Sequence, residues 1–310
     1  MYKILNSQGL GVAGKQNELI ELALTHGFDG VEVDMTDLIG RHDTLGKQFA
    51  CQFLQSAKID MGTFKLPIDL GASDEKYTES IAKLDTILDL ATTLNARSCY
   101  VEIIPNNGEF SFQENFEKHQ SRLQELSEKF GDLKIGLFLK ASNQKPVDGE
   151  FKFIQTADEL LTLVKAVGQP NVGVCLDAWE WVVGGGTVEQ LTTAGIKETV
   201  TEIRLADVAE GANVAEIKSS ERTSLPGCEA NSFSVALCKA ISASDADITI
   251  SVATDLSTFS EGSRDNVVSQ LSKQLDLLIA GEDPFAIKQA EAAAAEASEA
   301  EAEKVAAAAE

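Results

Sequence analysis

The strongest chemical signal in the sequence lies in residues 171–187, which read NVGVCLDAWEWVVGGGT. An apolar run ends there at the acid Asp177, and a second acid, Glu180, follows between two tryptophans. A short apolar run bounded by turn residues is typical of a strand buried in a parallel sheet. We therefore expect Asp177 to lie where a buried strand opens onto a polar site. The alternative is that Asp177 caps the next helix or pairs locally.

The elements that would position these acids alternate regularly along the chain. Eight stretches have the character of strands, and stretches with helical spacing or composition lie between them. Eight alternations over about 280 residues predict an α/β fold, a (β/α)8 TIM barrel. A doubly wound open sheet is the rival, but no G-x-G-x-x-G motif follows the first strand. The predicted strands are residues 3–6, 31–33, 59–64, 98–104, 135–139, 172–176, 203–206 and 248–252, and the predicted helices are residues 16–25, 75–94, 115–130, 157–167, 188–191, 233–241 and 265–279.

The domain organisation follows from a change in composition near the carboxyl terminus. We predict one barrel domain over residues 1–281 and an acidic tail over residues 282–310, which is almost wholly Ala and Glu from residue 289 onward. Both residue types favour helix, but the tail has no leucine stripe to bury. We expect a frayed helix or a disordered tail. A partner-binding helix is the remaining alternative.

The overall composition excludes several classes of function. The formal net charge of −23 argues against a nucleic-acid partner, because a phosphate-binding surface needs clustered Lys and Arg. No apolar run approaches the roughly 20 residues of a membrane span. The first ten residues, MYKILNSQGL, do not resemble an export signal, so we expect a cytoplasmic location. The five cysteines are scattered without a C-x-x-C pair, which disfavours a disulfide scaffold or a zinc ribbon.

The carboxyl ends of the predicted strands select the candidate site residues, because the loops that follow barrel strands converge on one face. Acids and cations occur together in this set. Carboxylates accept hydrogen bonds from hydroxyls and Arg grips anionic oxygens, so the mixture suits a polyhydroxylated or phosphorylated small molecule. The alternative is an internal salt-bridge network. The candidates are Asn6, Gln8, Asp34, Lys65, Glu102, Lys140, Asp177, Glu180, Arg204, Asp207 and Arg222.

Four sequence segments together resemble one known family. They are GFDGVEVDM at 27–35, NVGVCLDAWEW with GGGT at 171–187, IRLADV at 203–208 and RTSLPG at 222–227. In this order they resemble the xylose isomerase-like TIM-barrel superfamily, in its sugar phosphate isomerase/epimerase branch. The resemblance implies a sugar-like ligand and a divalent metal that polarises a carbonyl while a carboxylate moves a proton. It also implies a homo-oligomer, since dimers and tetramers are common in the family.

The metal ligands that the resemblance implies are poorly retained. Asp177 matches one of four positions, whereas Phe138, Arg204 and Ala253 occupy the other three. Glu180 stands where the family often has a histidine. An arginine cannot ligate a metal, although its charge can stabilise a substrate oxyanion. We therefore assign no cofactor from the sequence, and a divalent metal is implied by the resemblance alone.

The sequence and the resemblance together predict a sugar or sugar phosphate isomerase/epimerase-like enzyme with a degraded metal site. In this hypothesis carboxylates transfer the proton and the cations hold anionic oxygens of the substrate. A non-catalytic sugar-binding barrel is the alternative. The predicted proton-transfer groups are Asp177, Glu180 and Glu102, and the predicted substrate-binding groups are Lys65, Lys140, Arg204, Asp207 and Arg222.

Overall fold

The computed structural model describes residues 1–107, 110–141, 151–244, 246–255 and 263–308. Within these ranges the main sheet is parallel, in the order β3-β2-β1-β11-β10-β9-β7-β5-β4. Its strands are β1 (Tyr2–Leu5), β2 (Gly30–Val31), β3 (Asp60–Met61), β4 (Thr63–Lys65), β5 (Ser98–Ile103), β7 (Lys134–Leu139), β9 (Val172–Asp177), β10 (Val200–Leu205) and β11 (Thr249–Val252).

The sheet closes through β3 and β4, which are two parts of one barrel strand. β3 pairs with β2, β4 pairs with β5, and only Gly62 separates them. The Gly62 nitrogen donates to the Val31 oxygen at 2.9 Å, while the Gly62 oxygen accepts from the Arg97 nitrogen at 3.2 Å. A side chain at position 62 would collide with Ile4, so the strand needs glycine where it bridges both edges. The structure thus confirms the predicted (β/α)8 barrel.

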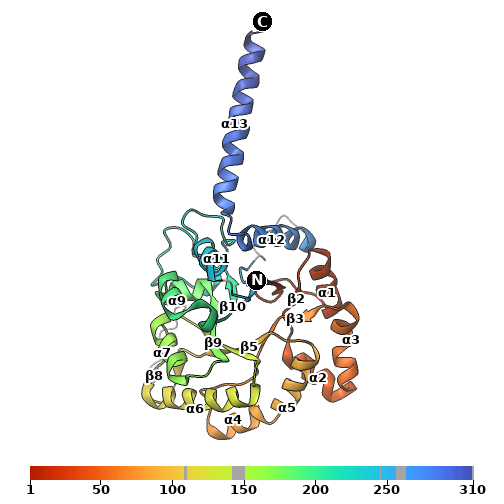
Figure 1. The fold of residues 1–310 in the computed structure, drawn as a ribbon, viewed down its shortest axis with the longest axis vertical. Helices are drawn as coiled ribbons and strands as arrows, with labels where there is room; N and C mark the ends of the chain where they lie inside the picture. The colour runs from red at the N-terminus through yellow and green to blue at the C-terminus, as the bar shows by residue number, and fades with distance from the viewer. Residues whose placement is uncertain (108–109, 142–150, 245, 256–262, 309–310) are drawn as a thin grey trace.

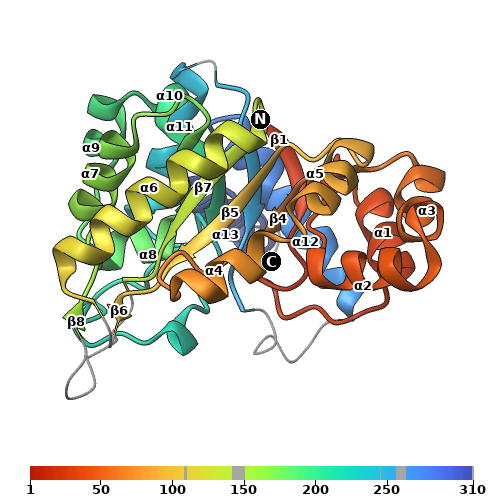
Figure 2. The same ribbon diagram turned by 90° about the horizontal axis from the view of Figure 1, so that it is seen from below.

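Helices surround the barrel on its outer face (Figures 1 and 2). The predicted helix over residues 75–94 is in fact two helices, α4 (Asp74–Ile81) and α5 (Leu84–Thr93). Helix α4 contacts α6, where the Tyr77 hydroxyl donates to Glu125 at 3.3 Å. Helices α2 and α3 and the short antiparallel pair β6–β8 were not predicted. The helices are α1 (Gln16–Thr25), α2 (Met35–Leu45), α3 (Lys47–Ala57), α4 (Asp74–Ile81), α5 (Leu84–Thr93), α6 (Phe112–Phe130), α7 (Ala157–Val167), α8 (Ala178–Val183), α9 (Val188–Ala194), α10 (Ile196–Thr199), α11 (Phe233–Ser244) and α12 (Arg264–Ile279), and the short strands are β6 (Asn106–Asn107) and β8 (Phe151–Lys152).

An irregularity in β10 shapes the interior of the barrel. The pairing of β10 with β9 shifts register between Val200 and Glu202, so Thr201 is an extra residue in the ladder. A side chain at Gly136 or Gly173 would come too close to Thr201. One glycine on the adjacent strand β9 and one on β7 therefore make room for the bulge. Beyond the bulge, Glu202 and the residue two positions later share one face of the strand.

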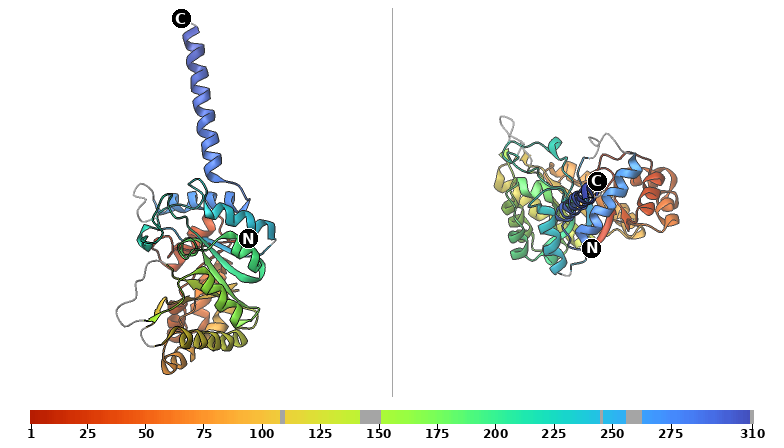
Figure 3. Two further views of the ribbon diagram at one scale, coloured as in Figure 1. Left: turned by 90° about the vertical axis from the view of Figure 1, so that its left-hand side faces the viewer. Right: turned by 90° about the horizontal axis from the view of Figure 1, so that it is seen from above.

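The acidic tail forms one helix, α13 (Pro284–Ala308), which projects away from the barrel (Figures 1 and 3). Residues 288–298 of this helix are exposed, in agreement with the absence of a leucine stripe. Whether the helix frays in solution stays a prediction. Among the helices in the described ranges, none combines the length and apolar character needed to cross a membrane.

Candidate functional site

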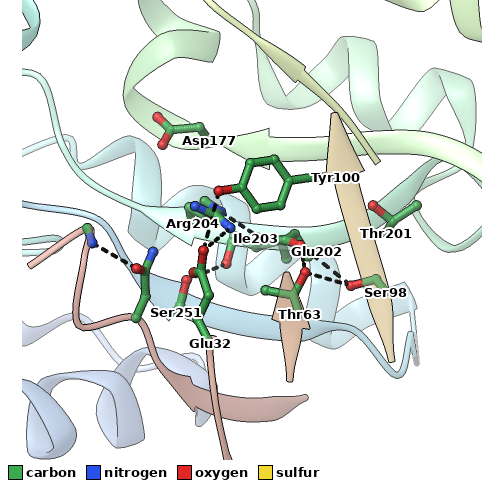
Figure 4. Close-up of polar contacts among 12 residues, drawn as sticks. Glu32, Thr63, Ser98, Tyr100, Asp177, Thr201, Glu202, Ile203, Arg204 and Ser251 are labelled. Carbon is green, nitrogen blue, oxygen red and sulfur yellow. Dashed lines mark hydrogen bonds and ion pairs between the residues drawn. The ribbon is translucent and has the colours of Figure 1, made fainter. Parts of the chain in front are cut away.

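A buried cluster of charges occupies the centre of the barrel. The Arg204 Nε donates to Glu202 Oε1 at 2.7 Å, and Arg204 Nη2 donates to Glu32 Oε1 at 3.1 Å. The three side chains are between 1% and 8% exposed. Figure 4 shows the guanidinium group between carboxylates that come from opposite parts of the chain. The two carboxylates fix the position and the orientation of this cation.

Side chains from β4 and β5 complete the cluster with hydroxyls and a ring. Thr63 Oγ1 donates to Glu202 Oε2 at 2.5 Å, and the Tyr100 hydroxyl donates to Glu32 Oε1 at 3.3 Å. The guanidinium carbon of Arg204 lies 4.1 Å from the centre of the Tyr100 ring, a cation–π contact. Arg204 is thus held by ion pairs at its edge and by an aromatic ring at its face.

Burial disfavours the charged forms of both Glu32 and Arg204. It raises the pKa of Glu32, and Arg204 opposes that rise. Burial by itself would lower the pKa of Arg204, but the charges of Glu32 and Glu202 outweigh it and hold that pKa well above its ordinary value. Arg204 is therefore a permanent cation at neutral pH.

Asp177 caps the next helix, as the alternative to a ligand-binding role predicted, and it also pairs with an arginine 45 residues further along the chain. Its Oδ1 accepts from the Glu180 nitrogen at 3.0 Å, which caps α8, and it also accepts from Nη2 of Arg222. The Arg222 guanidinium lies 5.1 Å from the centre of the Trp179 ring. The second oxygen of Asp177 is buried and has no hydrogen-bond partner among the described residues. The catalytic roles predicted for Asp177 and Glu180 stay predictions.

A second ion-pair cluster joins the ends of three adjacent strands. Lys65 Nζ lies 2.7 Å from Glu102 Oε2, and Lys140 Nζ lies 3.2 Å from Glu102 Oε1. The Glu102 side chain is 21% exposed and is therefore more accessible than the central cluster. Burial alone would raise its pKa, but the two lysines outweigh burial and lower it. Glu102 is accordingly ionised at neutral pH.

Asp207 is directed into the long loop that follows β10. It accepts hydrogen bonds from the Gly227 nitrogen at 2.7 Å, the Ser232 hydroxyl at 2.6 Å and the Ser234 nitrogen at 3.0 Å. These contacts anchor the loop, and the substrate-binding role predicted for Asp207 stays a prediction. Of the other candidates, Asp34 caps α2 and Gln8 is exposed.

The four positions that correspond to the family's metal ligands lie at neighbouring strand ends. Arg204 is the register partner of Asp177, and Phe138 and Ala253 lie at the ends of the strands on either side. Phe and Ala have no ligating atom, and Arg is a cation. In the part of the chain that the structure describes, no group of three or more His, Cys, Asp or Glu side chains is placed to hold a metal ion. The residues present do not fit the implied metal.

Several residues of the central cluster were missed in the sequence. Glu202 and Arg204 alternate with apolar residues in the segment TEIRLA, and this period of two already places both on one strand face. Thr63, Ser98 and Tyr100 resemble ordinary strand residues, so they offered no such signal. Ser98 Oγ lies 3.5 Å from Glu202 Oε2 and completes the hydroxyl shell.

Comparison with known proteins identifies the fold family. The sequence profile of the xylose isomerase-like TIM barrel matches residues 20–254. No curated protein sequence matches the chain. Among solved structures, a xylose isomerase domain protein from Alicyclobacillus acidocaldarius has a TM-score of 0.78 at 18% identity, covering 91% of this chain and 99% of that chain.

Two further solved structures have the same fold. An IolI protein with a bound zinc atom has a TM-score of 0.72 at 18% identity, covering 90% of this chain and 98% of that one. A D-psicose 3-epimerase, determined in the presence of D-fructose, has a TM-score of 0.66 at 15% identity, covering 91% of this chain and 100% of that one. At these identities the likeness shows the fold alone. Because the profile match covers most of the sequence, the chain belongs to the xylose isomerase-like TIM barrel family.

Proposed function

We propose that the chain is a sugar isomerase- or epimerase-like enzyme that transfers a proton at a carbonyl-bearing polyol without the metal that the resemblance implies. The observation that carries this proposal is Arg204, a buried cation at the strand position of a metal ligand, held by Glu32 and Glu202. A preorganised positive charge away from water stabilises the oxyanion that develops when a proton leaves the carbon beside a carbonyl. The likeness to a D-psicose 3-epimerase supports this reaction class.

Glu102 is the best supported of the three predicted proton-transfer groups. Its carboxylate is partly exposed and ionised, so it can accept a proton from a bound substrate. Lys65 and Lys140 lie on either side of it and offer N–H donors to substrate oxygens. Asp177 then serves mainly to hold Arg222 and the start of α8. Assembly into a homo-oligomer is a further part of the proposal, which light scattering tests.

The ion pairs at the site favour a second candidate, a non-catalytic sugar-binding barrel. Glu102 binds two lysines and Asp177 binds Arg222, so both carboxylates are already engaged with cations. An enzyme must break such pairs to use the carboxylate as a base, whereas a binding protein can keep them intact. The two candidates differ in turnover and not in the class of ligand.

Carbon-bound deuterium uptake separates the two candidates. The full chain is incubated in heavy water with ketoses, inososes and their phosphates, and proton NMR follows the loss of signal from carbon-bound hydrogens. Turnover predicts uptake that Glu102→Gln abolishes, because the amide cannot accept the proton. Thermal stabilisation by a sugar without uptake identifies the binding barrel. Neither uptake nor stabilisation with any member of the panel contradicts both candidates.

A further inference from the structure

The tail helix α13 begins with a capped and buried turn. Asp283 Oδ1 accepts from the Phe285 nitrogen at 3.1 Å and from the Ala286 nitrogen at 3.2 Å, so its side chain caps the helix. Pro284 occupies the first helical position, which proline favours because its fixed φ suits a helix start. Pro284 is buried, whereas residues 288–298 are exposed. The tail therefore has an anchored first turn from which the exposed part extends.

The first turn of α13 packs against the RTSLPG segment at 222–227. A Cβ atom on Gly227 would lie only 3.1 Å from Cδ and from Cγ of Pro284, so the two residues are in close contact. Helix α12 adds a second contact, because Gln274 Nε2 donates to the Pro226 oxygen at 2.7 Å. Figure 1 shows α13 leaving the barrel next to α12. The two helices thus hold the same end of the RTSLPG segment.

The other end of the RTSLPG segment is Arg222, whose side chain reaches the candidate site. Its Nη2 donates to Asp177, and its guanidinium lies 5.1 Å from the centre of the Trp179 ring. The segment is only a few residues long and contains Pro226, whose ring fixes φ. A displacement of Gly227 is therefore passed along the backbone to Arg222.

Residues that follow β10 and β11 also hold the segment, but at other backbone atoms. The bonds are those from the Asp255 nitrogen to the Arg222 oxygen at 3.0 Å, from Thr254 Oγ1 to the Ser224 oxygen at 3.1 Å and from the Gly227 nitrogen to Asp207 Oδ2 at 2.7 Å. None of these three bonds involves the Pro226 oxygen, which Gln274 binds, or the α-carbon of Gly227, which Pro284 approaches. Helices α12 and α13 therefore add restraints that the strand ends do not supply.

We infer that Pro284 and Gln274 are positioning residues for Arg222. They hold the RTSLPG segment so that the guanidinium stays against Asp177 and Trp179. The first turn of the tail therefore contributes to the site, although it lies outside the predicted barrel domain. The inference goes beyond the proposed function, because it gives a role to a part of the chain that the reaction does not use. Only its consequence for ligand binding rests on that function.

The two tryptophans of the chain report the position of Arg222 directly. Nitrogen-15 NMR of the full chain resolves their two indole N–H signals. Trp179 lies beside the Arg222 guanidinium, whereas Trp181 Nε1 donates to the Thr187 oxygen at 3.2 Å and serves as the internal reference. Arg222→Met removes the charge next to Trp179 and calibrates the resulting shift of its signal. Arg222→Lys gives the calibration if the methionine variant does not fold, because lysine keeps the charge but loses the planar group.

Two conservative substitutions remove the positioning contacts. Pro284→Ala removes the Cγ and Cδ atoms that approach Gly227 and leaves a good helix former in place. Gln274→Met removes the N–H donor to the Pro226 oxygen and keeps a side chain of similar length. Each variant should move the Trp179 signal in the direction set by the arginine substitution, and the double variant should move it further.

Matched controls come from the same two helices. Gln289→Ala on α13 and Gln270→Met on α12 replace exposed glutamines, so the Trp179 signal should keep its wild-type position. An unmoved Trp181 signal and an unchanged circular dichroism spectrum show that the fold is intact. A Trp179 signal that stays in place in the double variant overturns the positioning role. Equal shifts of both tryptophan signals also overturn it, because they indicate a general loosening of the barrel.

Ligand binding separates the positioning role from the proposed function. Titration calorimetry compares wild type, the double variant and Arg222→Met, with the monophosphates of D-fructose as probes. Both variants should bind about tenfold more weakly than wild type, since a charge-assisted hydrogen bond to an anionic oxygen is lost or misplaced. Unchanged affinity in the double variant, together with weakened binding by Arg222→Met, overturns the positioning role. Failure of wild type to bind any probe counts against the substrate role of Arg222 in the proposed function, whereas the Trp179 signal decides the positioning role with or without a ligand.

Discussion

Arg204 and Glu32 lie 172 residues apart in sequence and form an ion pair of 3.1 Å across the inside of the barrel. The pair connects β10 with the end of β2, which are separated in the sheet by β11 and β1. Its formation therefore requires a sheet that curves back on itself. Glu202 adds a second carboxylate on the strand of Arg204 itself. The carboxylates of this chain therefore hold a cation at a fixed position in the core of the barrel.

Removal of the central cation should strongly destabilise the fold. Arg204→Met leaves Glu32 and Glu202 buried without their charged partner, and the loss of one member of a buried ion pair costs about 3–5 kcal/mol. Urea unfolding at pH 7 measures this loss. Arg264→Met is the control, because its pair with Glu18 is 41% exposed on both sides, so its loss should destabilise the fold far less than loss of the central pair. An equal loss of unfolding free energy in the two variants would show that the central ion pair stabilises the fold no more than the exposed pair does.

The stability of the chain should carry a pH dependence that comes from Glu32. Its folded pKa is raised above the ordinary value of 4.5, so the folded state binds the proton more tightly than the unfolded state does. The contribution is present below that ordinary value and is lost as the pH rises through the higher folded pKa. Glu32→Gln removes it. The measured quantity is the unfolding free energy of wild type minus that of Glu32→Gln, and it should fall as the pH rises from 4 to 8. A rise of this difference over the same range would contradict a raised pKa for Glu32.

The pKa of Glu102 is shifted in the opposite direction to that of Glu32, so its effect on stability should have the opposite pH dependence. Its pKa lies below the ordinary 4.5, so its contribution is present above that value and is lost as the pH falls through the lower folded pKa. Carbon-13 NMR of the labelled carboxyl group measures the pKa. The double variant Lys65→Met, Lys140→Met should raise it, since burial then acts alone. The stability change should stay near 0–1 kcal/mol because both lysines are partly exposed. An unchanged pKa in the double variant would show that the lysines do not hold the carboxylate.

Asp177 should prove more important to folding than a purely ligand-binding residue. Asp177→Ala removes the cap of α8, worth about 0.5–2 kcal/mol, and also leaves Arg222 without its carboxylate. Asp177→Asn keeps an oxygen for both contacts and should lose less stability. Thermal unfolding of the two variants gives the comparison. If alanine is as stable as asparagine, the cap and the pair with Arg222 contribute little.

The barrel was predictable because burial leaves a clear pattern in the sequence. Strands covered on both faces appear as short apolar runs, and the apolar run at 172–176 identified β9 and its terminal Asp177. The break at Gly62 was not predictable, because it depends on how the two sheet edges meet. Helices α2 and α3 were missed in a stretch that mixes polar and apolar residues, with Gly46 between them.

The charged residues of the site were only partly predictable. Arg204 and Asp177 were found because strand ends carry them to the same face of the barrel. Glu202 lies inside its strand, where an acid that alternates with residues of the opposite face is also typical of an exposed strand face. Its burial depends on barrel closure, and so does its contact with Thr63, 139 residues away. Contacts between distant segments of this kind leave no local signal in one sequence.

The most direct test of the account is deuterium uptake by protein from which all divalent metal has been removed. The chain is dialysed against EDTA, its metal content is measured, and carbon-bound deuterium is followed in the sugar panel with and without added Mn, Mg, Zn or Co. The account predicts uptake without metal, no stoichiometric bound ion, and loss of uptake in Glu102→Gln. Uptake that appears only when a divalent metal is restored, with one ion bound per chain, would contradict it.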